Sequence, residues 1–149
     1  MRHDPLQPIL DHLAAQPLFS TSTPRELRAV ANLGTTIAVR DGAVLTRQGA
    51  LGREFCVLTA GHALCLIDDR PVAVFGAGDF FGEMALLDGG RRQATVIAQG
   101  CAQVLVLDVR EFRQLLDSSP SVAAKITAAC STRRHANEHF RITVEPVSA

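Results

Sequence analysis

The distribution of glycine constrains this chain more than any other feature of its sequence. All eleven glycines lie between Gly34 and Gly100, so neither the first 33 nor the last 49 residues contain one. Glycine permits the tight turns that join short strands, and it weakens helices. We therefore expect a helical beginning, a β-rich middle and a helical end.

Short apolar stretches occupy the glycine-containing middle of the chain. They have the length of strands and include residues 36–39, 55–58, 63–67, 71–75 and 102–107. Turn signals separate them at Asp41-Gly42, the run from Gly49 to Gly52, Ala60-Gly61 and Asp68-Asp69. This spacing predicts an antiparallel barrel or jelly roll.

Helix signals flank this middle part on both sides. Before Gly34, apolar residues recur at helical spacing at Leu6, Ile9, Leu10 and Leu13. The capping box Thr23-Pro24-Arg25-Glu26 begins a second short helix there. At the other end, Asp108-Val109-Arg110-Glu111 predicts a helix from near Val109, and Ser119-Pro120 predicts a final helix from about 120 into the 130s.

The basic and acidic residues argue against a general nucleic-acid-binding surface and against a Walker A phosphate loop. The 15 basic and 15 acidic residues give a formal net charge of +0, so no general basic field attracts nucleic acid. The single lysine, Lys125, follows no glycine-rich run, and this excludes a Walker A phosphate loop.

Cysteine usage and hydropathy bear on the compartment. The cysteines at 56, 65, 101 and 130 form no C-x-x-C pair, and the opening MRHDPLQPIL lacks the apolar run of a signal peptide. No apolar stretch approaches the ~18 residues of a membrane span. We expect a cytoplasmic chain whose cysteines are core residues or surface thiols.

The segment 75–96 carries the chemistry. It combines a glycine turn at Gly82, one helical turn over residues 83–87, a loop at 88–90 and a strand entered through Arg92. Free N–H groups at a helix start favour an anion, and an arginine can grip it with paired donors. Glu83 would repel a phosphate unless the same ligand offers it a donor, as a ribose hydroxyl does. The pattern predicts a nucleotide whose phosphate folds back toward its ribose.

These residues closely resemble a known family. The run F-G-E-M-A-L-L-D-G-G-R-R-Q-A-T-V resembles the phosphate-binding cassette of cyclic-nucleotide-binding domains, found in protein kinase A regulatory subunits, catabolite-activator-type regulators and bacterial cyclic-nucleotide-gated channels. Upstream, Gly49-x-x-Gly52-x-x-Phe55-Cys56-Val57-x-x-x-Gly61 resembles the G-x-x-G turn and strand of that family. The resemblance covers about residues 10 to 135.

The resemblance implies a fold and a domain layout. The expected fold is α+β, an eight-strand antiparallel β-roll of jelly-roll type flanked by N-terminal and C-terminal helices. Residues 1–149 would form a single cyclic-nucleotide-binding domain. Its parts would be N-terminal helices over 1–33, a β-roll over 34–108 with its cassette at 81–94, and C-terminal helices over 109–140.

The resemblance also implies roles for individual residues. Glu83 would bind the ribose 2′-OH, Arg92 the cyclic phosphate, and backbone groups at Gly82, Ala85 and Gln93 the remaining oxygens. The full ligand-binding set is Gly82, Glu83, Met84, Ala85, Arg92, Gln93 and Ala94. Arg133, Arg134 or Phe140 would close over the base as a lid, although a solvated helix end is the alternative reading of these three.

Two positions depart from the family pattern. The residue before the cassette arginine is often Pro and here is Arg91, so two arginines compete for the phosphate. Spacing from Glu83 and the following Q-A-T-V favour Arg92, with Arg91 facing solvent. The residue after that arginine is commonly Ser, Thr or Ala and here is Gln93, which leaves base preference open.

Other interpretations of the same residues compete with this one. Glu83 and Arg92 could form only an internal ion pair, and Gly76-x-Gly78-x-x-x-Gly82 could open a dinucleotide loop if a long helix followed. His62 is the only histidine between Gly34 and Gly100, so we expect no metal site. His135-x-x-x-His139 lacks matching ligands, and no nucleophile and base pair is evident. We expect a binding domain, not an enzyme.

The expected function is that of a sensor. Cyclic AMP is the favoured ligand and cyclic GMP the alternative, and binding would move the C-terminal helices by population shift. The output would pass to an unidentified protein partner or to self-association, because too few residues follow Phe140 for a winged helix-turn-helix and only 33 precede Gly34. The second hypothesis is a protein-interaction module that is ligand-free or binds another ligand, such as cyclic di-GMP. The oligomeric state is left open.

Overall fold

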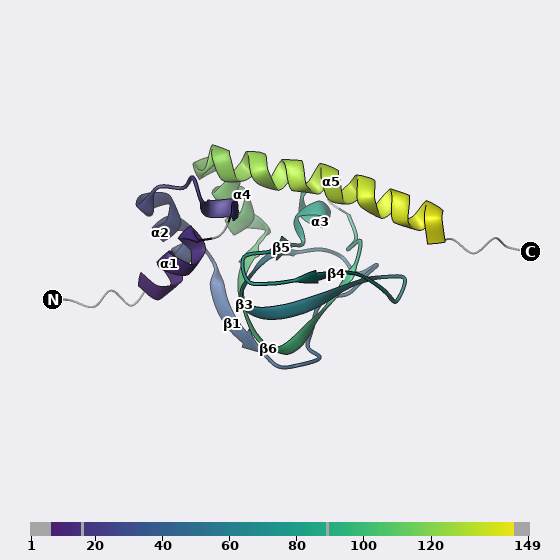
Figure 1. The fold of residues 1–149 in the computed structure, drawn as a ribbon. Coiled ribbons are helices and arrows are strands. Elements are labelled where there is room, and N and C mark those ends of the chain that lie inside the picture. Colours follow the sequence, from purple (N-terminus) through teal and green to yellow (C-terminus); the bar gives the residue numbers. More distant parts are fainter. Residues whose placement is uncertain (1–6, 16, 89, 145–149) are drawn as a thin grey trace, which may run out of the picture.

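Helices gather at one end of a curved sheet, and one long helix extends from that end over the sheet (Figure 1). The structure is a computed structural model that describes residues 7–15, 17–88 and 90–144, with side chains other than those at positions 8, 9, 12, 17, 88 and 134–144. The helical elements are α1 (Gln7–Ala14), η1 (Pro17–Phe19), α2 (Pro24–Leu33), α3 (Glu83–Asp88), α4 (Val109–Ser118) and α5 (Pro120–Val144).

The sheet is antiparallel throughout. Its strands are β1 (Thr35–Val39), β2 (Val44–Thr46), β3 (Glu54–Ile67), β4 (Arg70–Phe75), β5 (Phe80–Phe81) and β6 (Thr95–Asp108). They are ordered β1-β6-β3-β4, with β2 paired to β6 and β5 to β3. The expected antiparallel β-roll with flanking helices is confirmed, but the described residues form six strands and not eight.

The lower strand count follows from two glycines. Gly61 has φ +87°, and the β3–β6 register shifts twice beside it, between Leu58 and Ala60 and again between Ala60 and His62. The predicted turn at Ala60-Gly61 is therefore wrong: a β-bulge bends the strand without ending it. Gly100, with φ +74°, lies in the same way inside β6. The 14-residue strands β3 and β6 each replace two of the shorter strands that we expected.

Both predicted capping boxes are present. Thr23 Oγ1 accepts from the backbone N–H of Glu26, whose side chain accepts from the N–H of Thr23. Asp108 and Glu111 exchange the same pair of hydrogen bonds at the start of α4. Such boxes satisfy N–H groups that have no partner within a helix, so they set where α2 and α4 begin.

The core has two parts. One lies between the helices and the adjoining end of the sheet, with Phe55, Leu105, Leu107, Phe112 and Leu115 at its centre. The other lies inside the roll and includes Leu58, Phe81, Val96 and Val104. Cys56, Cys65 and Cys130 are buried and Cys101 is exposed, as expected, and burial raises the pKa of the Cys56 thiol to about 12.

The first half of α5 packs against the core between the helices and the sheet. Val122 and Ile126 are completely buried, which contributes about 1.5–3 kcal/mol for each side chain. Lys125 Nζ donates to the carbonyl oxygen of Leu18 at 3.4 Å and contacts the hydroxyl groups of Ser20 and Thr21. From this anchor α5 continues above α3 (Figure 1). In the described part of the chain, no helix combines the length and apolar character needed to cross a membrane.

Candidate functional site

A tight turn joins β5 to α3 and leads the chain into the site. Gly82 has φ +96°, and a Cβ atom there would lie 2.5 Å from both Arg92 Nη1 and the carbonyl oxygen of Glu54. Glycine is therefore required for the turn and for the close approach of Arg92. The helix α3 is only six residues long, after which the chain returns to the sheet through Arg92.

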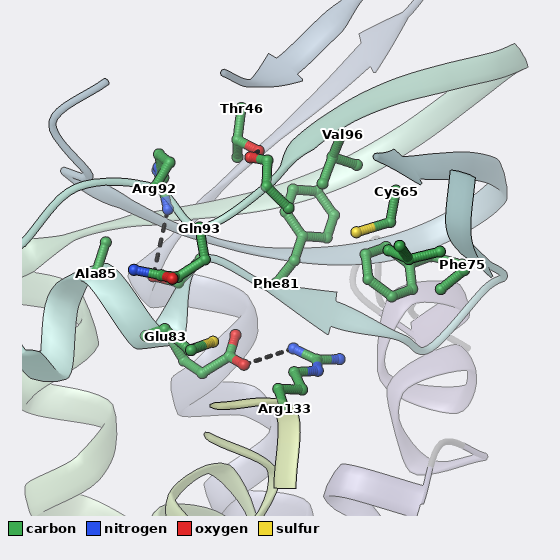
Figure 2. A pocket seen from close by; sticks show the side chains of 15 residues that line it. Thr46, Cys65, Phe75, Phe81, Glu83, Ala85, Arg92, Gln93, Val96 and Arg133 are labelled. Carbon is green, nitrogen blue, oxygen red and sulfur yellow. Dashed lines mark hydrogen bonds and ion pairs between the residues drawn. The ribbon is translucent and has the colours of Figure 1, made fainter. Parts of the chain in front are cut away.

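The turn and α3 border a pocket of about 350 Å³ (Figure 2). Its lining comes from five strands, two helices, the turn at Gly82 and the segment between α3 and β6: Thr46, Cys65, Val72, Ala73, Phe75, Phe81, Gly82, Glu83, Met84, Ala85, Arg92, Gln93, Ala94, Val96 and Arg133. Figure 2 shows Arg92 and Gln93 on one side of this pocket and Cys65 and Phe75 on the other. The pocket thus has a polar end and an apolar end.

Arg92 is a buried cation. Only 8% of the residue is exposed, and Nη1 donates to the carbonyl oxygen of Gly82 at 3.3 Å. Among the described side chains, no carboxylate lies within ion-pairing distance of this guanidinium. Burial lowers the pKa of Arg92, because water is withdrawn from the charged form. A buried arginine of this kind is suited to receive an anion from outside the protein.

Glu83 is a buried carboxylate with one oxygen still available. The residue is 1% exposed, and Oε1 accepts from Arg133 Nη1 at 2.5 Å. Oε2 is buried without a hydrogen-bond partner among the residues that the structure describes. An unpaired buried acceptor is costly, and Oε2 has the capacity to accept a hydrogen bond from a donor inside the pocket. Glu83 pairs with Arg133 and not with Arg92, against the internal ion pair considered above.

Arg133 reaches the pocket from α5. Its guanidinium carbon lies 4.8 Å from the ring centroid of Phe80 and 5.4 Å from that of Phe75, both within cation–π range. The side chain is 28% exposed, and with Glu83 it closes one side of the pocket (Figure 2). Of the three candidate lid residues, Arg133 is thus at the site. The side chains of Arg134 and Phe140 lie outside the described residues.

The two neighbouring arginines have different surroundings. Arg91 is exposed, and its Nη1 donates to the carbonyl oxygen of Gly49 at 2.8 Å. Arg92 points into the pocket instead. This arrangement agrees with the expectation that Arg91 faces solvent.

Comparison with known proteins decides the family. The family model described as the cyclic nucleotide-binding domain matches residues 36–119, more than half of the chain. The chain belongs to this family. A cyclic nucleotide-gated potassium channel of Rhizobium etli is 36% identical over 122 residues, which are 82% of this chain and 34% of the channel. The chain spans about a third of the length of the curated relatives it matches.

Solved structures agree with this assignment. A structure of cAMP-bound PfPKA-R is similar with a TM-score of 0.79 at 27% identity, over 93% of this chain and 46% of that one. The regulatory domain of Toxoplasma gondii PKA with cAMP gives a TM-score of 0.73 at 29% identity, over 83% and 49% of the two chains. The fold is therefore that of a cyclic nucleotide-binding domain.

All seven ligand-binding residues inferred for this cyclic nucleotide-binding domain line the pocket, but sequence reasoning missed its apolar end. The missed lining residues are Thr46, Cys65, Val72, Ala73, Phe75, Phe81 and Val96. Cys65, Val72, Ala73 and Phe75 lie in predicted strands, yet strand alternation does not say which face of a strand turns toward the pocket. The bulge at Gly61 and the register shift after Cys65 change the faces again.

Gly52, which packs closely against Ala85 of α3, gives a testable prediction for the cyclic nucleotide-binding domain. A Cβ atom at Gly52 would lie 2.2 Å from Ala85 Cβ, so Gly52→Ala should lower the free energy of unfolding by about 1–3 kcal/mol. Urea unfolding measures the loss. Gly76→Ala is the matched control, because the nearest atom, in His62, is 3.9 Å away. Equal unfolding midpoints for the two variants would contradict the prediction.

Proposed function

We propose that residues 1–149 form one cyclic nucleotide-binding domain that binds a 3′,5′-cyclic nucleotide, with cyclic AMP preferred, and acts as a sensor without catalysing a reaction. One observation carries this proposal. Arg92, a buried cation, lines the same pocket as Glu83, whose buried Oε2 atom has no partner among the described residues. A cyclic nucleotide offers both an anion and a hydroxyl donor within one small molecule.

The polar end suits the sugar and phosphate. Arg92 would donate to the phosphate oxygens, together with backbone groups of Gly82, Ala85 and Gln93, while Glu83 Oε2 accepts from the ribose 2′-OH. Met84 and Ala94 complete the walls there. Charge-assisted hydrogen bonds of this kind are the strong ones in proteins. No bond of the ligand is formed or broken by these contacts.

The apolar end suits a purine base. Cys65, Val72 and Phe75 offer it an apolar surface, and the Arg133 guanidinium offers a planar cation beside it. The solved relatives hold cAMP, and this similarity supports cyclic AMP as the ligand here. Cyclic GMP remains the alternative ligand.

The contact between Glu83 and Arg133 supports a sensor. Because Arg133 lies on α5 and Glu83 on α3, a ligand that binds Glu83 changes the surroundings of the long helix. Movement of α5 then follows if the ligand binds one helix position better than the other. We propose that a protein partner in the cytoplasm reads this change, with no role for a metal or nucleic acid.

Calorimetric titration with cyclic AMP, cyclic GMP and cyclic di-GMP tests the proposal. We expect saturable binding of one cyclic AMP per chain, with the nucleotide recovered unchanged. Recovery of a hydrolysed nucleotide would identify an enzyme. Absence of binding by all three nucleotides would favour the second function, a ligand-free protein-interaction module.

Base preference depends on Gln93. The family resemblance implies that a Thr or Ser at this position meets the guanine amino group in cyclic-GMP-selective relatives. Thr95 cannot replace it because Thr95 does not line the pocket, and its Oγ1 is directed to the N–H of Gln48 at 2.9 Å. We expect the chain to prefer cyclic AMP by a few-fold to a hundred-fold, about 1–3 kcal/mol.

Gln93→Thr should therefore shift the ratio of dissociation constants toward cyclic GMP. Competition of both nucleotides for one labelled probe measures it. The control is Gln103→Thr, the same substitution at an exposed position of β6. Tighter binding of cyclic GMP by the parent chain would overturn the preference.

A further inference from the structure

Gln48 joins two segments that are far apart in the sequence. Its side-chain Oε1 accepts from the N–H of Asp68 at 2.8 Å, and its Nε2 donates to Asp68 Oδ1 at 2.8 Å. One amide thus satisfies both the backbone and the side chain of the same residue, 20 positions away. We call this pair of hydrogen bonds the Gln48–Asp68 clasp.

One side of the Gln48–Asp68 clasp holds the turn between β3 and β4. Asp68 and Asp69 have φ values of 52° and 62°, the left-handed region that a two-residue hairpin turn requires at both central positions. Aspartate tolerates this region better than most residues, but less well than glycine. The hairpin made by this turn carries Cys65, Val72 and Phe75, which form the apolar wall of the pocket.

The other side of the Gln48–Asp68 clasp holds the segment that leads from Arg92 into β6. The N–H of Gln48 donates to Thr95 Oγ1, and the next N–H, of Gly49, donates to the carbonyl oxygen of Arg92 at 2.9 Å. The N–H of Arg92 in turn donates to the carbonyl oxygen of Ala50 at 2.8 Å. The backbone of Gln48 and Gly49 is therefore bound to the segment 92–95, which bears the polar end of the pocket, and the side chain of Gln48 is bound to the hairpin that bears the apolar wall.

We infer that Gln48 is a positioning residue that fixes the span between the apolar wall and Arg92, and so lets one nucleotide fill both ends. This inference rests on the proposed function. Gln48 and Asp68 do not line the pocket, so the clasp acts through the hairpin and not by contact with the ligand. Loss of the clasp should weaken the binding of a ligand that contacts both ends more than the binding of a ligand that contacts only the polar end.

Two ligands separate positioning from general stability. For Gln48→Ala, we expect cyclic AMP to bind about tenfold more weakly (about 1.4 kcal/mol), and ribose 3′,5′-cyclic phosphate, which lacks the base, to change by less than about twofold. Competition against a fluorescent cyclic nucleotide measures both. Gln103→Ala, on the exposed face of β6, is the matched control. Equal weakening of the two ligands by Gln48→Ala would overturn the inference.

A double variant that exchanges the amide and the carboxylate should restore the Gln48–Asp68 clasp. Gln48→Glu removes the donor to Asp68 Oδ1 and places two carboxylates together, so cyclic AMP binding should weaken at least as much as in Gln48→Ala. Adding Asp68→Asn to it exchanges amide and carboxylate, so both hydrogen bonds re-form and binding should return to within about twofold of the parent. A double variant that stays as weak as Gln48→Glu contradicts the clasp.

Hydrogen exchange keeps this inference separable from the proposed function. In the ligand-free chain, the Asp68 amide should exchange about tenfold faster in Gln48→Ala than in the parent, because its acceptor is gone. Unchanged exchange would overturn the clasp whatever the ligand. A parent chain that binds no cyclic nucleotide would instead overturn the proposed function.

Discussion

Replacing Arg92 by alanine should weaken cyclic AMP binding at least ten- to a hundred-fold, about 1.5–3 kcal/mol, because charge-assisted hydrogen bonds to the phosphate are lost. Calorimetry or competition against a labelled nucleotide measures the change. The loss should be similar for ribonucleotides and 2′-deoxynucleotides, since both carry the same phosphate. Arg91→Ala is the matched control, because its guanidinium lies at the surface and donates to the carbonyl oxygen of Gly49.

A second substitution at Arg92 should separate the effect of this residue on ligand binding from its effect on stability. Arg92 is 8% exposed and no described carboxylate pairs with it, so its burial opposes folding. We expect Arg92→Met to bind as weakly as Arg92→Ala and to unfold in urea at a midpoint no lower than that of the parent. If Arg92→Ala binds as the parent does while Arg91→Ala does not, the roles of the two arginines are reversed.

Replacing Glu83 by glutamine should weaken binding of cyclic AMP about ten- to a hundred-fold, and binding of 2′-deoxy cyclic AMP much less. The ribose hydroxyl donates more strongly to a carboxylate than to an amide, and the deoxy ligand has no such donor. Glu83→Gln also weakens the contact with Arg133, but that loss is common to both ligands. The ratio of the two dissociation constants therefore isolates the contact with the sugar.

The control for this experiment is Glu54→Gln, a neutralised carboxylate at an exposed position that does not line the pocket. It should leave the ratio between the two ligands unchanged. Equal losses for both ligands in Glu83→Gln would mean that Glu83 holds Arg133 and the helix α5 instead of the ribose.

Local sequence signals determined much of this protein. The capping boxes at Thr23 and Asp108 each need only residues three apart, so the starts of α2 and α4 could be predicted closely. The polar end of the pocket could be predicted for the same reason. Gly82, Glu83 and Ala85 are consecutive or nearly so, and Arg92 follows within ten residues, so one short segment folds them together.

Only the tertiary structure decided the rest. Arg133 meets Glu83 across 50 positions of sequence, and Gln48 meets Asp68 across 20, so neither contact follows from local spacing. The apolar wall depends on strand register, and a shift by one residue turns every side chain to the opposite face. The bulge at Gly61 also depends on strand pairing. The sequence predicts a turn there, but the strand continues because β6 pairs with β3 both before and after Gly61. Helix caps and a contiguous cassette are short-range, whereas register and the docking of α5 depend on packing between segments distant in the chain.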